Sequence, residues 1–296
     1  MNRFITKAVI PAAGLGTRMF PATVSVAKEM LPYGSRPIIE YIVRDAVESG
    51  IEQILIVINK GKEGIISHFK PNEFQENELL RKNKLNELAL VRELQNLCQI
   101  EFVYQDQLAG LGDAIAMARN FTGKDAFAVL LGDNVLISHT KRTILSTMID
   151  VFNQYQKSVV AVQSINPKEV YRYGIMFGTH LGKRVYQVIG WVEKPEICEA
   201  PSNIAVAGQY IFTPEIYDAL EKTEAGINGE LQITDAMDLI ARESTCYSYL
   251  IDGERKDLGN YKSYLQANIE YGLKDPKYGS DLKDWLRKKL KEDNLH

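Results

Sequence analysis

The chain has 296 residues, of which 45% are hydrophobic and 25% are charged, with a formal net charge of −3. These values are typical of one large globular domain or two fused ones, and they exclude the basic surface expected of a partner of nucleic acid or of an anionic membrane. No apolar stretch approaches the ~18 residues that would span a bilayer, so we expect a cytoplasmic protein without a membrane contact.

Cysteine and histidine usage indicates neither a disulfide framework nor a zinc site. Cys98, Cys198 and Cys246 lie far apart and form no C-x-x-C pair. The four histidines are scattered, without the spacing of a metal-binding motif. The pattern predicts reduced thiols in a cytoplasmic protein.

The first half of the chain predicts strands and helices in alternation. An apolar run at 7–12 is typical of a buried strand, and it leads into a glycine-rich loop at 12–18. Pro37 and Gly50 bracket a predicted helix over 37–50, and the apolar run 53–59 predicts a strand covered on both faces. Strand, loop, helix and strand form a βαβ unit, so we expect a parallel sheet wound with helices.

The later segments extend this pattern. Residues 73–97 lack Gly and Pro and predict one or two solvated helices inserted in the domain; a strand follows at 100–105, a glycine loop with a helix at 110–121, and a strand at 126–134. The second half predicts strands at 158–165, 173–178, 184–195, 203–212 and 246–252, and helices at 214–222, 233–242, 261–273 and 281–296. We expect a single domain, 1–296, with a first half at 1–135, a second half at 136–260 and a C-terminal helical segment at 261–296.

The loop at 12–18 is a candidate phosphate-binding element. A glycine-rich loop after a first strand lets backbone N–H groups approach phosphate oxygens closely. It is neither a Walker A sequence nor the G-x-G-x-x-G fingerprint, because Thr17 and Arg18 follow Gly16. The alternative interpretation is a tight turn whose glycines serve only its backbone conformation. Two cations after the loop, Arg18 and Lys28, favour a triphosphate site.

From these motifs onward the chain resembles the bacterial UTP–glucose-1-phosphate uridylyltransferases. The resemblance runs in order along nearly the whole chain. Its blocks are AAGLGTRMFPAT at 12–23, AKEMLP at 27–32, Gln105 with GLG at 110–112, LGDN at 131–134, YGI at 173–175, VEKP at 192–195, APSN at 200–203, GELQITDA at 229–236 and DLGN at 257–260. It implies an α/β fold with a Rossmann-like mixed, mostly parallel central sheet flanked by helices.

The resemblance also implies roles for particular residues. Ala13, Gly14, Gly16, Thr17, Glu29, Gln105 and Gly112 would bind the nucleotide; Arg18 would bind the departing pyrophosphate, and Lys28 the nucleotide phosphates; Gly174, Glu193 and Asn203 would line the sugar pocket, and Lys194 would hold the sugar phosphate; Asp133 and Asp257 would hold Mg²⁺. The catalytic set would be Arg18, Lys28, Asp133 and Lys194. The substrates would be UTP and glucose 1-phosphate, and the protein would be a homodimer or homotetramer whose product serves cell-surface polysaccharide synthesis.

The chemistry of this reaction agrees with those residue types. It joins two polyanions, so it needs cations more than a base, and a phosphate monoester is already nucleophilic near neutral pH. Mg²⁺ prefers carboxylates together with phosphate oxygens. Asp133 follows an apolar strand, where open α/β sheets bind ligands. Asp257 lies more than a hundred residues away, and its pairing with Asp133 rests on the resemblance alone. By itself it is more typical of a turn.

Some positions depart from the family pattern. Val24 stands where Lys is usual, Ala27 where Pro is usual, and Asp113 where His is usual, and the turn at 34–37 differs as well. We expect the lost cation at Val24 to weaken triphosphate binding. Asp113 adds a negative charge, which would raise the KM for UTP or relax the choice of base.

Two alternatives remain open from the sequence. A thymidylyltransferase using dTTP would share many of these blocks, and uracil differs from thymine by one methyl group, worth only ~1–3 kcal/mol in a pocket. The helical insertion and the AKEMLP block favour the uridylyltransferase. A non-catalytic regulatory paralogue is the other alternative, although Thr17, Arg18 and both acidic metal candidates are retained.

Overall fold

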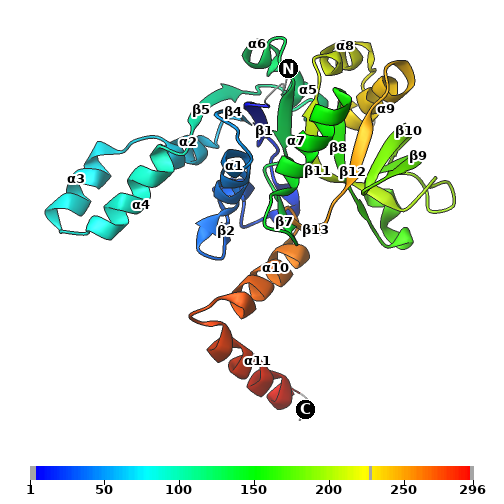
Figure 1. Ribbon diagram of the computed structural model, residues 1–296. Helices are drawn as coiled ribbons and strands as arrows, with labels where there is room; N and C mark the ends of the chain where they lie inside the picture. The colour runs from blue at the N-terminus through cyan, green and yellow to red at the C-terminus, as the bar shows by residue number, and fades with distance from the viewer. Residues whose placement is uncertain (1–4, 227–228, 294–296) are drawn as a thin grey trace.

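A nine-stranded sheet forms the centre of the computed structural model, which describes residues 5–226 and 229–293. Its strands are β1 (Lys7–Pro11), β4 (Gln53–Ile58), β5 (Gln99–Tyr104), β6 (Phe127–Leu130), β8 (Val159–Ser164), β9 (Gly174–Gly182), β10 (Val185–Glu193), β11 (Ile204–Phe212) and β12 (Tyr247–Leu250). They lie in the order β5-β4-β1-β6-β11-β8-β12-β10-β9 (Figure 1). The sheet therefore draws strands from both predicted halves of the chain, and the division at 135 stays a prediction.

The sheet is mixed. Strands β5, β4, β1 and β6 are parallel to one another, and β12 is parallel to β8. Strand β11 is antiparallel to both β6 and β8, and β10 is antiparallel to both β9 and β12. The expectation of a mixed sheet flanked by helices is confirmed, whereas the expected predominance of parallel pairing is not, because half of the neighbouring pairs in this order are antiparallel. Parallel pairing is concentrated in the N-terminal half, because the second half is connected partly by a short hairpin, which requires antiparallel strands.

Helices cover both faces of the sheet (Figure 1). On one face lie α1 (Ile38–Glu48), α2 (Glu63–Phe69) and α7 (Ile144–Tyr155), and on the other α5 (Leu111–Ala116), α8 (Glu215–Lys222) and α9 (Ile233–Glu243). Successive strand residues serve opposite faces: Ala8 and Ile10 pack with the first group, whereas Val9 packs with the second. The central strands are thus apolar throughout, as the sequence predicted.

Several short elements surround the ends of the strands. They are the 3-10 helices η1 (Thr17–Met19), η2 (Lys28–Met30) and η3 (Pro167–Arg172), the pair β2 (Pro32–Tyr33) and β3 (Arg36–Pro37), and the pair β7 (Asn134–Ser138) and β13 (Gly253–Asp257). Strands β7 and β13 are antiparallel, with Asp257 opposite Asn134. The sequence analysis anticipated neither strand of this pair, nor helices α2 and α7.

Two helical pairs project from the body (Figure 1). The insertion predicted at 73–97 forms α3 (Glu73–Arg81) and α4 (Leu85–Gln95), in which Leu88 alone is buried. The second projecting pair, α10 (Tyr261–Lys274) and α11 (Gly279–Asp293), extends away from the sheet near the C-terminus.

The helix predicted at 110–121 is divided in the structure into α5 and the short α6 (Arg119–Thr122).

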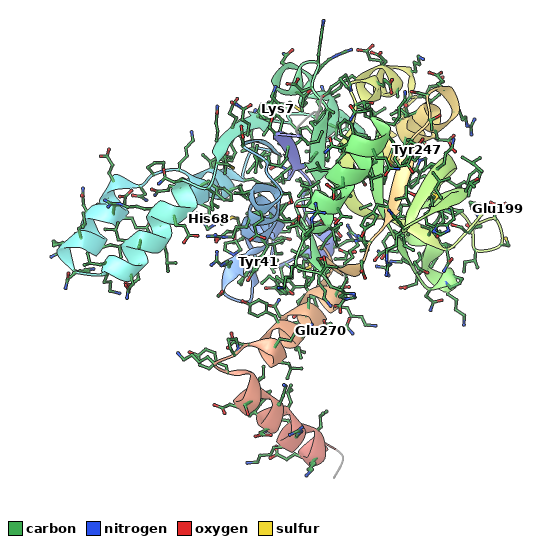
Figure 2. The ribbon with its side chains drawn as sticks, in the orientation of Figure 1. Lys7, Tyr41, His68, Glu199, Tyr247 and Glu270 are labelled. Carbon is green, nitrogen blue, oxygen red and sulfur yellow. The ribbon has the colours of Figure 1, made fainter. Side chains whose placement is uncertain are left out.

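Helix α10 is attached to the body by a cluster of tyrosines. The ring of Tyr33 lies 5.2 Å from that of Tyr271 and 5.2 Å from that of Tyr41, which Figure 2 labels. The hydroxyl of Tyr264 donates to the Pro32 carbonyl at 2.7 Å. Within the described residues, no helix has the length and apolar character that a membrane crossing demands.

Candidate active site

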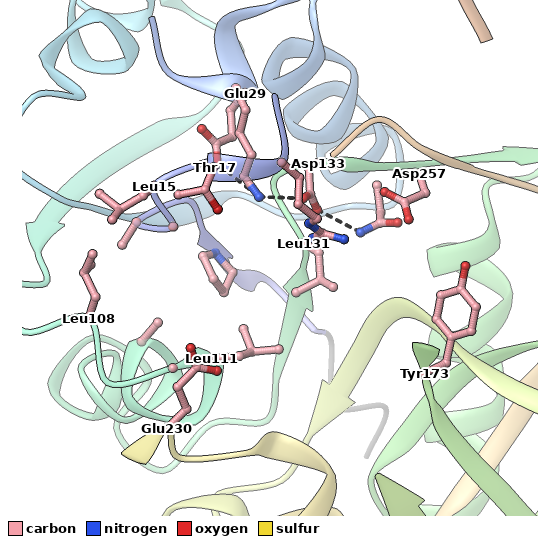
Figure 3. Close-up of a pocket in the computed structure, with 18 of the residues that line it drawn as sticks. Leu15, Thr17, Glu29, Leu108, Leu111, Leu131, Asp133, Tyr173, Glu230 and Asp257 are labelled. Carbon is pink, nitrogen blue, oxygen red and sulfur yellow. Dashed lines mark hydrogen bonds and ion pairs between the residues drawn. The ribbon is translucent and has the colours of Figure 1, made fainter. Parts of the chain in front are cut away.

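A cavity of about 850 Å³ opens at the carboxyl ends of β1, β5 and β6 (Figure 3). This is where open α/β sheets bind their ligands. Of the residues proposed from the sequence, the lining includes Ala13, Gly14, Thr17, Arg18, Lys28, Glu29, Gln105, Asp133 and Asp257. Residues that are widely separated in the sequence therefore face one space.

Two carbonyl groups of the glycine-rich loop after β1 accept hydrogen bonds from buried side chains. Lys62 Nζ donates to the Ala12 carbonyl, and Asn59 Nδ2 donates to the Ala13 carbonyl. Among the described residues, the N–H groups of Gly14 and Leu15 donate to no partner. Anchored carbonyls and free N–H donors are what a phosphate-binding loop requires.

Lys28 and Asp133 form the central ion pair of the cavity. Lys28 Nζ lies 2.5 Å from Asp133 Oδ2, and Asn134 Nδ2 donates to Asp133 Oδ1 at 2.9 Å. Burial raises the pKa of Asp133, but the charge and hydrogen bond of Lys28 outweigh burial and leave that pKa below its usual range. Burial lowers the pKa of Lys28, but Asp133 and Glu29 outweigh it and raise that pKa. Both groups are therefore charged at neutral pH.

A second buried pair lies beneath the first. Lys62 Nζ is 2.8 Å from Glu29 Oε2, and both side chains are almost fully buried. Burial raises the pKa of Glu29 despite the opposing charge of Lys62. The other oxygen, Glu29 Oε1, has no hydrogen-bond partner and lies 3.9 Å from Lys28 Nζ. Lys62, Glu29, Lys28 and Asp133 thus form a line of alternating charges, in which Lys62 was not identified from the sequence.

The two acidic metal candidates converge through the pairing of β7 with β13. That pairing sets Asp257 opposite Asn134, the neighbour of Asp133 (Figure 3). A Cβ added to Gly259 would overlap Asp133 Oδ2 and lie 3.4 Å from Asp257 Oδ1, so the glycine keeps the space between the carboxylates open. Two carboxylates beside a phosphate-binding loop suit Mg²⁺, which takes its other ligands from phosphates and water. The residues present therefore fit the metal.

Arg255 is a cation of the cavity that the sequence analysis missed. Its Nε donates to Asn134 Oδ1 at 2.6 Å, and its guanidinium carbon lies 5.0 Å from the centre of the Tyr173 ring. A guanidinium nitrogen is 3.6 Å from Asp257 Oδ2. The only signal in the sequence was a basic residue two positions before a candidate metal ligand, which is weak without knowledge of the strand pairing.

None of the four residues proposed for the sugar belongs to the lining of the cavity. Glu193 Oε2 accepts from Thr234 Oγ1 at 2.7 Å, and Lys194 Nζ lies 2.9 Å from Glu193 Oε1. A Cβ on Gly174 would meet the same Thr234 hydroxyl at 2.8 Å. The Lys194 amide donates to the carbonyl of Tyr173, which does line the cavity. The structure thus brings Gly174, Glu193 and Lys194 together.

Asn203, Gly16 and Gly112 do not line the cavity either. The side chain of Asn203 donates to Ser164 Oγ and to the Ile165 carbonyl. Gly16 has a φ of 69° and precedes η1, so it shapes the loop. The amide of Gly112 donates to the Leu231 carbonyl at 2.9 Å, and a Cβ there would lie 2.7 Å from that oxygen. Gly112 therefore allows close packing of α5 against the segment before α9.

Comparisons with known proteins agree with this geometry. The sequence model of the nucleotidyl transferase family matches residues 7–273. The chain is 41% identical over 291 residues to UTP–glucose-1-phosphate uridylyltransferase 1 of Staphylococcus saprophyticus, covering 97% of each chain.

Two solved structures are also similar. A UDP-glucose pyrophosphorylase complexed with UDP-glucose has a TM-score of 0.85 and 38% identity, over 92% of this chain and 100% of that one. A UTP-bound UGPase from Acinetobacter baumannii has a TM-score of 0.88 and 37% identity, over 96% of this chain and 99% of that one. With its cavity, its fold and this similarity along almost its whole length, the chain belongs to the nucleotidyl transferase family and, within it, to the UTP–glucose-1-phosphate uridylyltransferases.

Proposed function

We propose that this protein transfers a uridylyl group from UTP to glucose 1-phosphate, giving UDP-glucose and pyrophosphate. The observation that carries the proposal is the single cavity in which the loop after β1, the cations Arg18 and Lys28 and the carboxylates of Asp133 and Asp257 face one another. Relatives that hold UTP or UDP-glucose share this fold and over a third of the sequence, which supports the same substrates here.

The reaction forms one phosphorus–oxygen bond and breaks another. A phosphate oxygen of glucose 1-phosphate attacks the α-phosphorus of UTP, and the bond to the pyrophosphate oxygen breaks. No side chain has to remove a proton, because the attacking phosphate is already ionised near neutral pH. The contribution of the protein is positioning and charge neutralisation.

Different residues of the chain provide the positioning and the charge neutralisation. The free N–H groups of Gly14 and Leu15, with Arg18, hold the β- and γ-phosphates; Lys28 neutralises charge beside the α-phosphate. Lys194 holds the sugar phosphate, and Glu193, with Gly174 and Asn203, orients the hydroxyls. Asp133 and Asp257 would hold a divalent cation, proposed to be Mg²⁺. When bound, the cation supplies charge neutralisation and orientation at the phosphate oxygens.

The nucleoside lies at the other end of the cavity in this proposal. Leu108 and Leu111 give that end an apolar wall, and Gln105 and Ala13 add polar and backbone groups (Figure 3). Val24, where a cation is missing, is 70% exposed and lies outside the lining. Its effect on triphosphate binding is therefore expected to be small.

The cellular setting is also proposed. All three cysteines are free, which is typical of a reducing compartment such as the cytoplasm. UDP-glucose would serve as the glucosyl donor for cell-surface polysaccharide. The projecting helices α10 and α11 are proposed to contribute to the contacts of a homodimer or homotetramer.

The test is pyrophosphate release with Mg²⁺, glucose 1-phosphate and each of UTP, dTTP, CTP, ATP and GTP, with Asp133→Ala and Lys194→Ala in parallel. UTP is expected to give the highest kcat/KM. Each variant is expected to lose at least ~100-fold, the scale of removing one charge-stabilising group. A higher kcat/KM with dTTP would make the protein a thymidylyltransferase, and binding of UTP without turnover would make it a regulatory paralogue.

A further inference from the structure

The side-chain amide of Gln105 is held by two acceptors on α5 and the loop before it. Gln105 follows β5, is 4% exposed and lines the cavity. Its Nε2 donates to Asp113 Oδ2 at 2.7 Å and to the Gly110 carbonyl at 3.2 Å. No other side chain among the described residues makes a hydrogen bond to this amide group.

The chemistry of the two acceptors dictates the orientation of the amide. A backbone carbonyl cannot donate, and an ionised carboxylate cannot either, so the group that faces both must be the NH₂. Both of its hydrogens are then used within the protein. The remaining group, Gln105 Oε1, has no hydrogen bond to any described residue. Gln105 therefore offers the cavity a hydrogen-bond acceptor and no donor.

The backbone that carries Asp113 is fixed by hydrogen bonds and close packing. It lies in the first turn of α5, where its carbonyl accepts from the Met117 amide at 3.1 Å. The neighbouring Gly112 amide donates to Leu231 at 2.9 Å, and a Cβ on Gly112 would overlap Leu231 and Leu220. Because this turn is closely packed, it fixes the position from which the Asp113 carboxylate holds the Gln105 amide. The Asp113 carboxylate therefore lies against the amide of Gln105, which donates to it.

We propose that Asp113 is a positioning residue that determines base specificity by locking the Gln105 carbonyl toward the base. A pyrimidine with an N3–H, such as uracil, can donate to Gln105 Oε1. Cytosine has an unprotonated N3, so two acceptors would face each other, and a site built to pair with a donor rejects the analogue that lacks it. The inference rests on the proposed function, because it requires a pyrimidine nucleotide in the cavity.

The test compares UTP with CTP on the full-length enzyme and Asp113→Asn. The asparagine keeps the size of the side chain but can present either an acceptor or a donor, so it accepts both orientations of Gln105. We expect the ratio of kcat/KM for UTP to that for CTP to fall about tenfold, the scale of one charge-assisted hydrogen bond. Asp106→Asn is the matched control, because Asp106 is exposed, adjoins Gln105 and pairs with Lys60 at 3.3 Å. It should leave the ratio unchanged.

Calorimetric binding of UTP and CTP to the same proteins separates this inference from the proposed function. A loss of preference in Asp113→Asn, with an unchanged melting temperature, supports the inference even for a protein that turns over neither nucleotide. An equal loss of activity with both nucleotides indicates a structural role only and overturns it. A wild-type protein that binds UTP and CTP equally also overturns it, whereas turnover of UTP would still uphold the proposed function.

Discussion

At the scale of single residues, the environment decides what a carboxyl group does. Asp133 and Glu29 are buried and Asp45 is half-buried, yet their pKa values shift differently. A close ammonium group lowers the pKa of Asp133, whereas burial prevails at Glu29 and raises its pKa. Residue type alone, as the sequence presents it, does not distinguish these cases.

Asp45 on α1 gives this contrast a measurable consequence. Burial raises its pKa to about 7, opposed by a hydrogen bond from Gln209 Nε2 at 2.6 Å. Between its unfolded pKa, about 3.9, and pH 7, the folded protein binds a proton that the unfolded chain does not. This contribution to stability is fully present below the unfolded pKa and is lost as the pH rises through 7.

Asp45→Asn removes the titrating proton and keeps an acceptor for Gln209. We expect the free energy of unfolding of the wild type to fall between pH 5.5 and pH 8 by about 2 kcal/mol more than that of the variant. Urea unfolding at the two pH values measures both. Parallel pH profiles for the two proteins would contradict the assignment.

At the scale of elements, the short pair β7 and β13 assembles the acidic end of the cavity. Strand β7 continues directly from Asp133, and β13 ends at Asp257, so pairing them juxtaposes the two carboxylates and brings in Arg255. The turn that follows β13 completes the arrangement. In this turn the Gly259 amide donates to Asp257 Oδ1 at 3.1 Å, and the absence of a side chain on Gly259 leaves room between the two carboxylates.

Gly259→Ala tests this turn. The added Cβ would overlap Asp133 Oδ2, so we expect kcat/KM to fall at least ~100-fold and the Mg²⁺ concentration for half-maximal activity to rise. Gly64→Ala in α2 is the control, because a Cβ there meets no atom within 4 Å. Normal activity and Mg²⁺ dependence in Gly259→Ala would exclude a metal between these carboxylates.

At the scale of the whole molecule, the cavity and helix α11 lie apart. The cavity is lined by residues from 11 to 257, and α11 contributes none of them. Helix α11 packs on α10, where a Cβ on Gly272 would lie 2.7 Å from Leu282. Trp285 remains 54% exposed on it, which is unusual for so large an apolar side chain.

Deletion of residues 276–296 therefore has a predicted outcome. We expect kcat/KM to change less than about threefold, which corresponds to a change of under about 1 kcal/mol in the activation free energy. Light scattering is expected to report a dimer or tetramer for the full chain and a smaller assembly for the truncated one. The same number of subunits in both assemblies would exclude α11 from the subunit contact. A large loss of activity would show that α11 supports the cavity.

The sequence by itself determined the class of fold and the segments that carry the site. Apolar periodicity, Gly and Pro placement and the loop at 12–18 are local properties, so they identified most strands and helices and led to Arg18, Lys28 and Asp133, whereas Glu29 came from the family resemblance. Only the tertiary structure decided which of these meet. Asp257 beside Asp133, Lys62 under Glu29 and Asp113 against Gln105 depend on strand pairing and helix packing. Contacts between distant segments have no local signature, because side-chain periodicity records burial and not the identity of the neighbour.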